Sequence, residues 1–170
     1  LITAYGQSGW LPSWSFPGHS GGMIGNHALS LIADAWVKGF RNYDPRHAME
    51  AMFHEATNKG PGGPANGRDG WKDYFIYGYV AYPDYRESTA KALEYCYDDW
   101  CAMQFASMTG QSFYEDLFGK QIFNYKNVYE PSTGCMRGRQ SDGDWVPDFD
   151  PVEWGGPFTE GSAWHYLWSV

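Results

Sequence analysis

The sequence predicts a mainly α-helical fold of antiparallel helices joined by long loops, with one small β-hairpin. Apolar residues recur with a helical period in four segments, at 26–40, 45–58, 88–109 and 111–129. These segments form two consecutive pairs, and helices that follow one another in this way usually pack antiparallel. An Asp-Gly pair at 142–143, within a loosely alternating stretch, predicts the hairpin.

The composition favours one globular domain and argues against two kinds of partner. The chain has 170 residues, 43% of them hydrophobic, which is enough for a sizeable core. A net charge of −8 argues against binding to nucleic acid. No apolar run approaches the roughly 18 residues that cross a bilayer, so we expect no membrane span. Aromatic residues reach 19%, a surplus that either packs helices or lines a sugar site.

The N-terminal part is expected to be a helix end followed by a loop. Residues 1–5 have the pattern of a final helical turn that closes near Gly6 and Gly9. Residues 10–25 are rich in Gly, Pro, Ser and Trp, which predicts a loop. Large side chains in this loop either form a binding surface or cover the core. They are Trp10, Trp14, Phe16 and His19.

The first pair of helices has clear boundaries. Gly39 ends the helix at 26–40, and Asp44 is a suitable N-cap for the next helix, with Pro45 at its first position. Residues 59–70 contain five glycines and two prolines, so they predict a loop or an insertion.

The second pair follows a short mixed segment. Residues 71–81 are expected to begin with a helical turn and end extended. Segment 88–109 then has the strongest helical pattern in the chain and is closed by Gly110, and Pro131 stops the helix at 111–129.

The most informative stretch is 158–168 (FTEGSAWHYLW). Thr159 is a suitable N-cap for a helix that would begin at Glu160, and at helical spacing Glu160 and Trp164 share one face. An indole beside a carboxyl removes water from it and raises its pKa, as a general acid requires, although a helix N-terminus favours the charged form. The alternative is an ordinary carboxylate in the first turn of a helix.

Five segments of the chain resemble one enzyme family. TEGSAWHYLW at 159–168 resembles the TEGNAWQYxW segment of glycoside hydrolase family 92, the calcium-dependent exo-α-mannosidases. The other segments occur in the family's order: GWLPSW at 9–14, GMIGNHA at 22–28 with IADA at 32–35 and KG at 38–39, LEYCYDDW at 93–100 and GCMRGR at 134–139. Five collinear matches are much more specific than any one of them.

The resemblance implies a partial (α/α)6 barrel, about half of one, with the active-site loops gathered at one end. It implies that residues 1–170 are a fragment of a single catalytic domain, cut at both ends. Half a barrel would leave an apolar flank open, so the expected partner is the remainder of the same polypeptide. We expect the fragment to be inactive alone.

The resemblance also implies an activity, the inverting hydrolysis of α-mannosidic linkages, of the α-1,2 type, in mannan or N-glycans. Glu160 takes the place of the family's general acid. Trp164, His165, Asn26 and His27 are the expected substrate-binding residues, and a mannose-containing glycan is the expected ligand. No metal ligand is assigned within the chain. Calcium is the expected cofactor, and the general base and most calcium ligands are expected outside this chain.

Two positions depart from the family pattern, and two other functions stay open. Ser162 stands in place of Asn and His165 in place of Gln, and both neighbour the acid. One alternative is another inverting (α/α)6 glycosidase, such as one acting on glucosides. The other is a non-catalytic, aromatic-rich helical module that binds carbohydrate. The family implies a secreted or periplasmic location, although the chain shows no signal segment.

Polar residues of the 88–109 segment are assigned structural roles. Asp98 and Asp99 face different sides of the helix, and we favour hydrogen bonding over catalysis for them. Cys96, Cys101 and Cys135 make an odd number without CxxC spacing, which favours buried thiols over a disulfide or a metal site.

Overall fold

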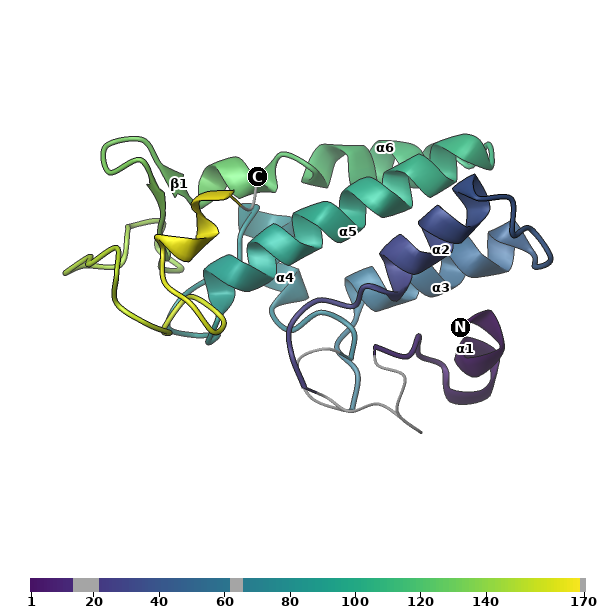
Figure 1. Cartoon of the computed structure of the whole chain (residues 1–170), viewed down its shortest axis with the longest axis horizontal. Coiled ribbons are helices and arrows are strands. Elements are labelled where there is room, and N and C mark those ends of the chain that lie inside the picture. Colours follow the sequence, from purple (N-terminus) through teal and green to yellow (C-terminus); the bar gives the residue numbers. More distant parts are fainter. Residues whose placement is uncertain (14–21, 62–65, 169–170) are drawn as a thin grey trace.

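The structure, a computed structural model, describes residues 1–13, 22–61 and 66–168. It is mainly α-helical and is organised around one long helix, α5 (Ser88–Met108), which runs through the middle of the molecule (Figure 1). The prediction of a mainly α-helical fold is therefore confirmed. Of the aromatic residues expected in the first loop, Trp14, Phe16 and His19 lie outside the described residues.

The other elements surround α5 on several sides. α6 returns along one side of α5, and α2 and α3 lie on another (Figure 1). The helices are α1 (Ile2–Ser8), α2 (Ala28–Val37), α3 (Pro45–Thr57), α4 (Trp71–Tyr77) and α6 (Ser112–Gln121), with 3-10 turns η1 (Asn124–Asn127) and η2 (His165–Trp168). The strands are β1 (Tyr129–Glu130) and β2 (Cys135–Met136).

Short and long connections lie at opposite ends of the helices. Residues 38–44 join α2 to α3, residues 109–111 join α5 to α6, and both connections lie at the right-hand end in Figure 1. The connection at 78–87 and the segment 122–164, which contains η1, β1 and β2, are longer and lie toward the other end. The predicted pairing of α5 with α6 is confirmed, whereas α2 and α3 pack mainly on α5 and not on each other. The long loops gather where binding residues are usually found.

Several helix ends form for the reasons that the sequence suggests. The side chain of Asp44 accepts a hydrogen bond from the Arg46 N–H at 2.9 Å, as an N-cap does. Gly9 ends α1 in the left-handed conformation, with φ 79°, and its N–H bonds to the carbonyl of Tyr5.

Two clusters of buried apolar side chains form the core, and α5 contributes to both. One joins the C-terminal half of α5 to α2, α3 and α6, with Phe105 and Phe118 fully buried. The other joins its N-terminal half to α4, the strands and the C-terminal segment, and includes Tyr95 and Phe158. Because Phe158 is in this core, the residues that follow it are anchored.

α5 also carries buried charge. Asp99 is fully buried, with one carboxylate oxygen 2.7 Å from Arg68 Nη2 and the other accepting a hydrogen bond from the Tyr74 hydroxyl at 2.9 Å. The Arg68 guanidinium lies over the ring of Tyr95, 4.8 Å from its centroid. This group of residues ties the 66–70 loop and α4 to α5. Asp98 and Asp99 are buried and hydrogen-bonded, as a structural role requires. The cysteines are free and buried, so the prediction of buried thiols is confirmed.

The predicted helix at 111–129 is shorter in the structure. α6 ends at Gln121, and a 3-10 turn follows only from Asn124. The Gln121 carbonyl faces the Tyr74 hydroxyl at 3.4 Å and the Cys96 thiol at 3.8 Å. Tyr74 of α4 and Cys96 of α5 thus donate to the Gln121 carbonyl, which would accept a backbone N–H if the helix continued.

The predicted hairpin around the Asp-Gly pair is confirmed, although it is very short and the two named strands form a separate ladder before it. β1 and β2 pair antiparallel, with Tyr129 opposite Met136, around a turn that the sequence analysis did not identify. At the Asp-Gly pair, a single bridge joins Arg139 to Trp145, and Gln140 N–H donates to the Asp144 carbonyl at 2.8 Å. The predicted turn exists, but it closes only a very short ladder.

The prediction of a helix that begins at Glu160 is wrong. Glu160 has φ 47°, which is left-handed, and regular structure resumes only with η2. In a helix, the Trp164 N–H would bond to the Glu160 carbonyl. It donates instead to the Pro151 carbonyl at 2.9 Å. A long-range bond therefore replaces the helical one, and Glu160 and Trp164 do not share a helix face.

One side of the molecule leaves large apolar side chains uncovered. Val37 on α2, Tyr97 and Trp100 on α5, and Phe123 after α6 are each between 47% and 63% exposed and line two adjoining grooves. Across the described residues, none of the helices is long and apolar enough to cross a membrane.

Candidate active site

Glu160 is the one exposed side chain in a buried run. Phe158, Thr159, Gly161 and Ser162 are all buried, whereas Glu160 is exposed. Its left-handed backbone turns the chain at this point. Left-handed non-glycine residues are uncommon and cluster at functional sites, so the conformation is consistent with a site residue.

The backbone is fixed on both sides of Glu160. The Tyr166 hydroxyl donates to the Thr159 carbonyl at 2.8 Å, and the Gly155 N–H donates to the Gly161 carbonyl at 2.8 Å. A Cβ on Gly161 would lie 3.2 Å from the Tyr166 ring, so this turn is packed closely. The Glu160 carboxyl is therefore displayed on a rigid support.

Ser162 and His165, the two departures from the family pattern, contact each other. His165 Nδ1 lies 2.9 Å from the Ser162 hydroxyl and accepts the Ser162 N–H at 3.2 Å. Because Nδ1 accepts a backbone N–H, the proton of the neutral ring lies on Nε2. Ser162 is 1% exposed and His165 is exposed, so the serine orients the histidine.

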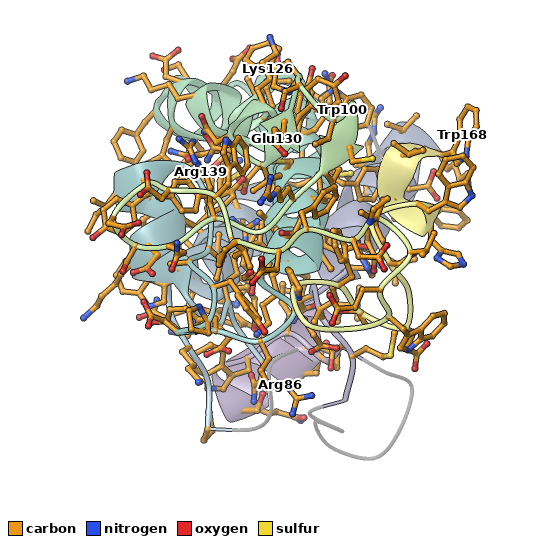
Figure 2. The ribbon with its side chains drawn as sticks, turned by 90° about the vertical axis from the view of Figure 1, so that its left-hand side faces the viewer. Arg86, Trp100, Lys126, Glu130, Arg139 and Trp168 are labelled. Atoms are coloured by element: carbon orange, nitrogen blue, oxygen red, sulfur yellow. The ribbon has the colours of Figure 1, made fainter. Side chains whose placement is uncertain are left out.

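Three exposed tryptophans lie within or just before the segment 158–168. Trp154 packs edge-on against His165, with ring centroids 5.6 Å apart, and Trp164 lies four residues after Glu160. Trp168 in η2 projects from the edge of the molecule (Figure 2) and is 89% exposed. Exposed indoles of this kind are suited to stacking on sugar rings.

Asn26, an expected substrate-binding residue, is buried and fully engaged. Its amide donates to the Leu11 carbonyl at 3.1 Å and to Glu55 Oε2 at 3.0 Å, and its carbonyl accepts the Ala28 N–H at 3.1 Å. Glu55 also accepts the Gly67 N–H at 2.9 Å. Burial raises the pKa of Glu55 to about 7, although these donors oppose the shift. Asn26 thus joins its own loop to Leu11 and, through Glu55 of α3, to the loop that contains Gly67.

His27 lies at the surface between two carboxylates of α5. Its Nδ1 is 3.3 Å from Oδ1 of the buried Asp98, and its Nε2 is 3.2 Å from Oε2 of the partly exposed Glu94. The hydrogen bond to Asp98, followed by that to Glu94, raises the pKa of His27 to about 10. The imidazole is therefore a cation at neutral pH.

α5 connects the His27 cluster to the Glu160 turn, because Tyr166 packs against the apolar cluster that contains Leu93, the residue before Glu94. Burial raises the pKa of the Tyr166 hydroxyl most, and the charge of Glu94 raises it further. Tyr166 is the residue whose hydroxyl fixes the Thr159 carbonyl. His27 and the turn that carries Glu160 thus both pack near the N-terminal half of α5. Asn26 supports the loop before His27 through its buried hydrogen bonds.

Comparison with known proteins decides the family. The family model for the glycosyl hydrolase family 92 catalytic domain matches residues 1–170, the whole chain. The chain belongs to glycoside hydrolase family 92. Its helices form part of the (α/α) barrel of this family's catalytic domain, as the sequence predicted.

The family 92 relatives include solved structures from Bacteroides thetaiotaomicron. The chain is similar to the inverting mannosidase BT2199, with a TM-score of 0.96 and 47% identity over 99% of this chain. It is similar to the α-mannosidase BT3965, with a TM-score of 0.89 and 37% identity over 99% of this chain. A further structure of BT3965 contains mannoimidazole and has 35% identity to this chain.

A curated relative is also similar to this chain. An uncharacterized secreted glycosidase of Arthroderma benhamiae is 28% identical in an alignment 167 positions long that covers 92% of this chain. The chain spans 21% of the length of that relative, and 23% and 22% of the lengths of BT2199 and BT3965.

The described part of this family 92 chain contains no cluster of three or more His, Cys, Asp or Glu side chains that could hold a metal ion. The carboxylates nearest to Glu160 along the chain are Glu153 and Asp150, which line a pocket. The described residues therefore offer no set of side-chain donors for the expected calcium ion.

Sequence reasoning missed Glu94 and Tyr166. Both lie within matched family segments, but neither belongs to a motif with an evident chemical role. Their importance comes from long-range contacts, with His27 in one case and with the Thr159 carbonyl in the other. The sequence offered only their proximity to matched residues as a signal.

Proposed function

We propose that this chain is part of the catalytic domain of an inverting exo-α-mannosidase and supplies its general acid, Glu160. The proposal is supported mainly by the match over the whole chain to family 92, whose solved relatives include an inverting mannosidase. The substrate class is an α-mannosidic linkage, of the α-1,2 type, in mannan or N-glycans.

The chemistry assigned to Glu160 is proton donation to the leaving oxygen. Inverting hydrolysis needs a second carboxylate, roughly 6.5 to 9.5 Å away, to activate water on the opposite face of the sugar. We assign that base, and the calcium ligands, to parts of the enzyme outside these 170 residues. It follows that the chain supplies one half of the acid–base pair and is inactive alone.

Substrate contacts are assigned to side chains around the Glu160 turn. Trp164 offers an apolar face for a sugar ring, and His165 offers its Nε2–H to a hydroxyl. His27 adds a positive charge that Asp98 and Glu94 hold in place. Asn26 acts through its support of the 22–28 loop, because its amide is already engaged.

The location proposed is secreted or periplasmic. It is supported by the curated relative, which is described as a secreted glycosidase.

An assay of the whole enzyme tests this function. Aryl α-mannoside should be hydrolysed and aryl α-glucoside should not, and a calcium chelator should abolish the activity. NMR of the first product should show the β-anomer of mannose, because inversion changes the configuration. Hydrolysis of the glucoside instead would favour another inverting glycosidase, and binding without turnover would favour a carbohydrate-binding module.

A further inference from the structure

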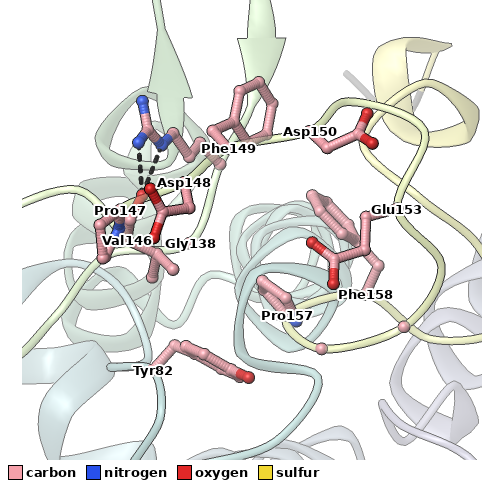
Figure 3. Close-up of a pocket in the computed structure, with 13 residues that line it drawn as sticks. Tyr82, Gly138, Val146, Pro147, Asp148, Phe149, Asp150, Glu153, Pro157 and Phe158 are labelled. Carbon is pink, nitrogen blue, oxygen red and sulfur yellow. Dashed lines mark hydrogen bonds between the residues drawn. The ribbon is translucent and has the colours of Figure 1, made fainter.

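A pocket beside the Glu160 loop has no role in the proposed chemistry. It is an open pocket whose space, counted together with the solvent at its mouth, is about 480 Å³. Its apolar walls are formed by Tyr82, Phe149, Phe158 and Pro157 (Figure 3). Residues from three separate parts of the chain meet here, so the pocket is a feature of the tertiary fold.

The walls of this pocket are fixed by contacts among the lining residues, which include Arg137, and by contacts with α5. The Arg137 side chain donates to the Val146 carbonyl at 2.9 Å and lies over the Phe149 ring, 4.8 Å from its centroid. The Pro157 carbonyl accepts the Thr89 and Ala90 N–H groups at the start of α5, at 3.0 and 3.1 Å. The pocket is therefore formed before any ligand arrives.

Gly138 allows two segments of the pocket wall to pack closely together. A Cβ on Gly138 would lie 3.0 Å from side-chain atoms of both Pro157 and Val146. Close packing at this point brings the 146–150 segment against the 155–158 segment, and the concave surface follows from their approach.

Three carboxylates stand around the pocket, from Asp148, Asp150 and Glu153 (Figure 3). Asp150 accepts the Val152 N–H at 3.0 Å, whereas Asp148 and Glu153 make no side-chain hydrogen bond or ion pair within the described residues. The three do not form a cluster that could hold one metal ion, among the residues described. They are acceptors spread around an aromatic-walled pocket.

We propose that this pocket binds a neutral sugar unit of the glycan. A pyranose presents hydroxyl donors around its edge and an apolar C–H face, which match dispersed carboxylate acceptors and aromatic walls. A phosphate or another anion would be repelled by the three carboxylates. The Arg137 guanidinium also lines the pocket, but it is already paired with Glu130 at 2.9 Å.

The pocket shares its loop with the proposed acid. Phe158 lines it two residues before Glu160, and Gly155, another lining residue, donates to the Gly161 carbonyl. A sugar bound here belongs to the same glycan chain as the sugar at Glu160. This inference rests on the proposed function only for the identity of the sugar as mannose.

The test is calorimetric titration of the whole enzyme with α-1,2-linked mannotriose, in a Glu160→Gln background that prevents hydrolysis. In that background, Asp148→Asn with Glu153→Gln should weaken binding about tenfold, because two charged acceptors are lost. The matched control is Asp116→Asn with Glu50→Gln, which removes the same charge from exposed positions on α6 and α3. The control should bind within about twofold of the parent.

Equal affinities of the two double variants would overturn the pocket assignment, and so would a parent that binds no mannotriose. The wild-type assay on aryl α-mannoside separates this inference from the proposed function. Hydrolysis with unchanged binding by the pocket variant would reject the pocket alone. No hydrolysis, but weaker binding by the pocket variant, would reject the activity and support the pocket.

Discussion

Glu160 is displayed by a turn whose neighbouring residues are buried and whose carbonyls on both sides are hydrogen-bonded. Rigid support of this kind keeps a carboxyl in one orientation without packing the carboxyl itself. A proton donor benefits, because misplacement of a catalytic group by about 1 Å is costly.

Replacing Glu160 by Gln tests its proton transfer directly. The amide keeps the size of the side chain but cannot donate a proton as the acid does. We expect kcat for natural mannosides to fall roughly 10²- to 10⁴-fold, with less loss for activated aryl leaving groups, which need little protonation. Steady-state kinetics on both substrate types provide the measurement, and an equal loss on both would argue against the acid role.

His27 gives the protein a pH dependence of known sign. Its folded pKa of about 10 lies above the ordinary value of 6.5. A raised pKa means that the stabilisation is complete below about pH 6.5 and is lost as pH rises toward 10. His27→Gln should therefore cost stability at pH 6 and little at pH 10.

The measurement is the midpoint of thermal denaturation across this pH range, as the difference between variant and wild type. His47→Gln is the control, since His47 is partly exposed and its Nδ1 lies 3.6 Å from Oε2 of Glu50. A His27→Gln difference that stays constant with pH would show that Asp98 and Glu94 do not hold the charged imidazole.

At the scale of elements, α5 carries a buried ion pair that joins it to the 66–70 loop. Asp99→Asn leaves the Arg68 guanidinium buried without its nearest counter-charge. We expect a loss of about 3 kcal/mol in the free energy of unfolding. Replacing Arg68 by Met and Asp99 by Leu together should cost less than the single change, because no lone charge remains.

Chemical denaturation of the single and double variants provides the comparison. A double variant that is less stable than the single one would show that the aromatic contacts of Arg68 with Tyr74 and Tyr95 outweigh its charge.

Elements set by local rules were predicted from the sequence. Asp44, Pro45 and Gly9 mark helix ends through short-range geometry, and α5 follows from its own periodicity. The Glu160 segment did not follow local rules, because the Trp164 N–H bonds to Pro151, thirteen residues earlier. Helix propensity is a property of the local sequence, so it cannot predict such a long-range bond.

The residues of the candidate site also fall into two groups, those that the sequence identified and those that only the structure revealed. The resemblance to family 92 located Glu160 and His27, but Glu94 and the Tyr166 hydroxyl became visible only through contacts between distant segments. Asn26 was selected as a substrate-binding residue, while the structure shows its amide bonded to Leu11 and Glu55. Sequence identified the neighbourhood and not the roles within it.

For the whole molecule, the uncovered apolar side of α2, α5 and α6 is the main energetic question. Two grooves flank Trp100, one lined by Val37 and Met108, the other by Leu93 and Phe123. Solvent contact with so much apolar surface is costly, at about 25 cal/mol per Å². We propose that further helices of the barrel cover it, since the chain spans about a fifth of its family 92 relatives.

The isolated chain 1–170 should therefore bind a dye such as ANS, associate as its concentration rises and unfold over a broad temperature range. Trp100→Gln with Phe123→Gln should reduce both dye binding and association. Trp154→Gln is the control, because Trp154 is 65% exposed in the Glu160 loop, outside this face. A sharp, concentration-independent unfolding transition of a monomer would contradict the idea, since the exposed face would then need no cover.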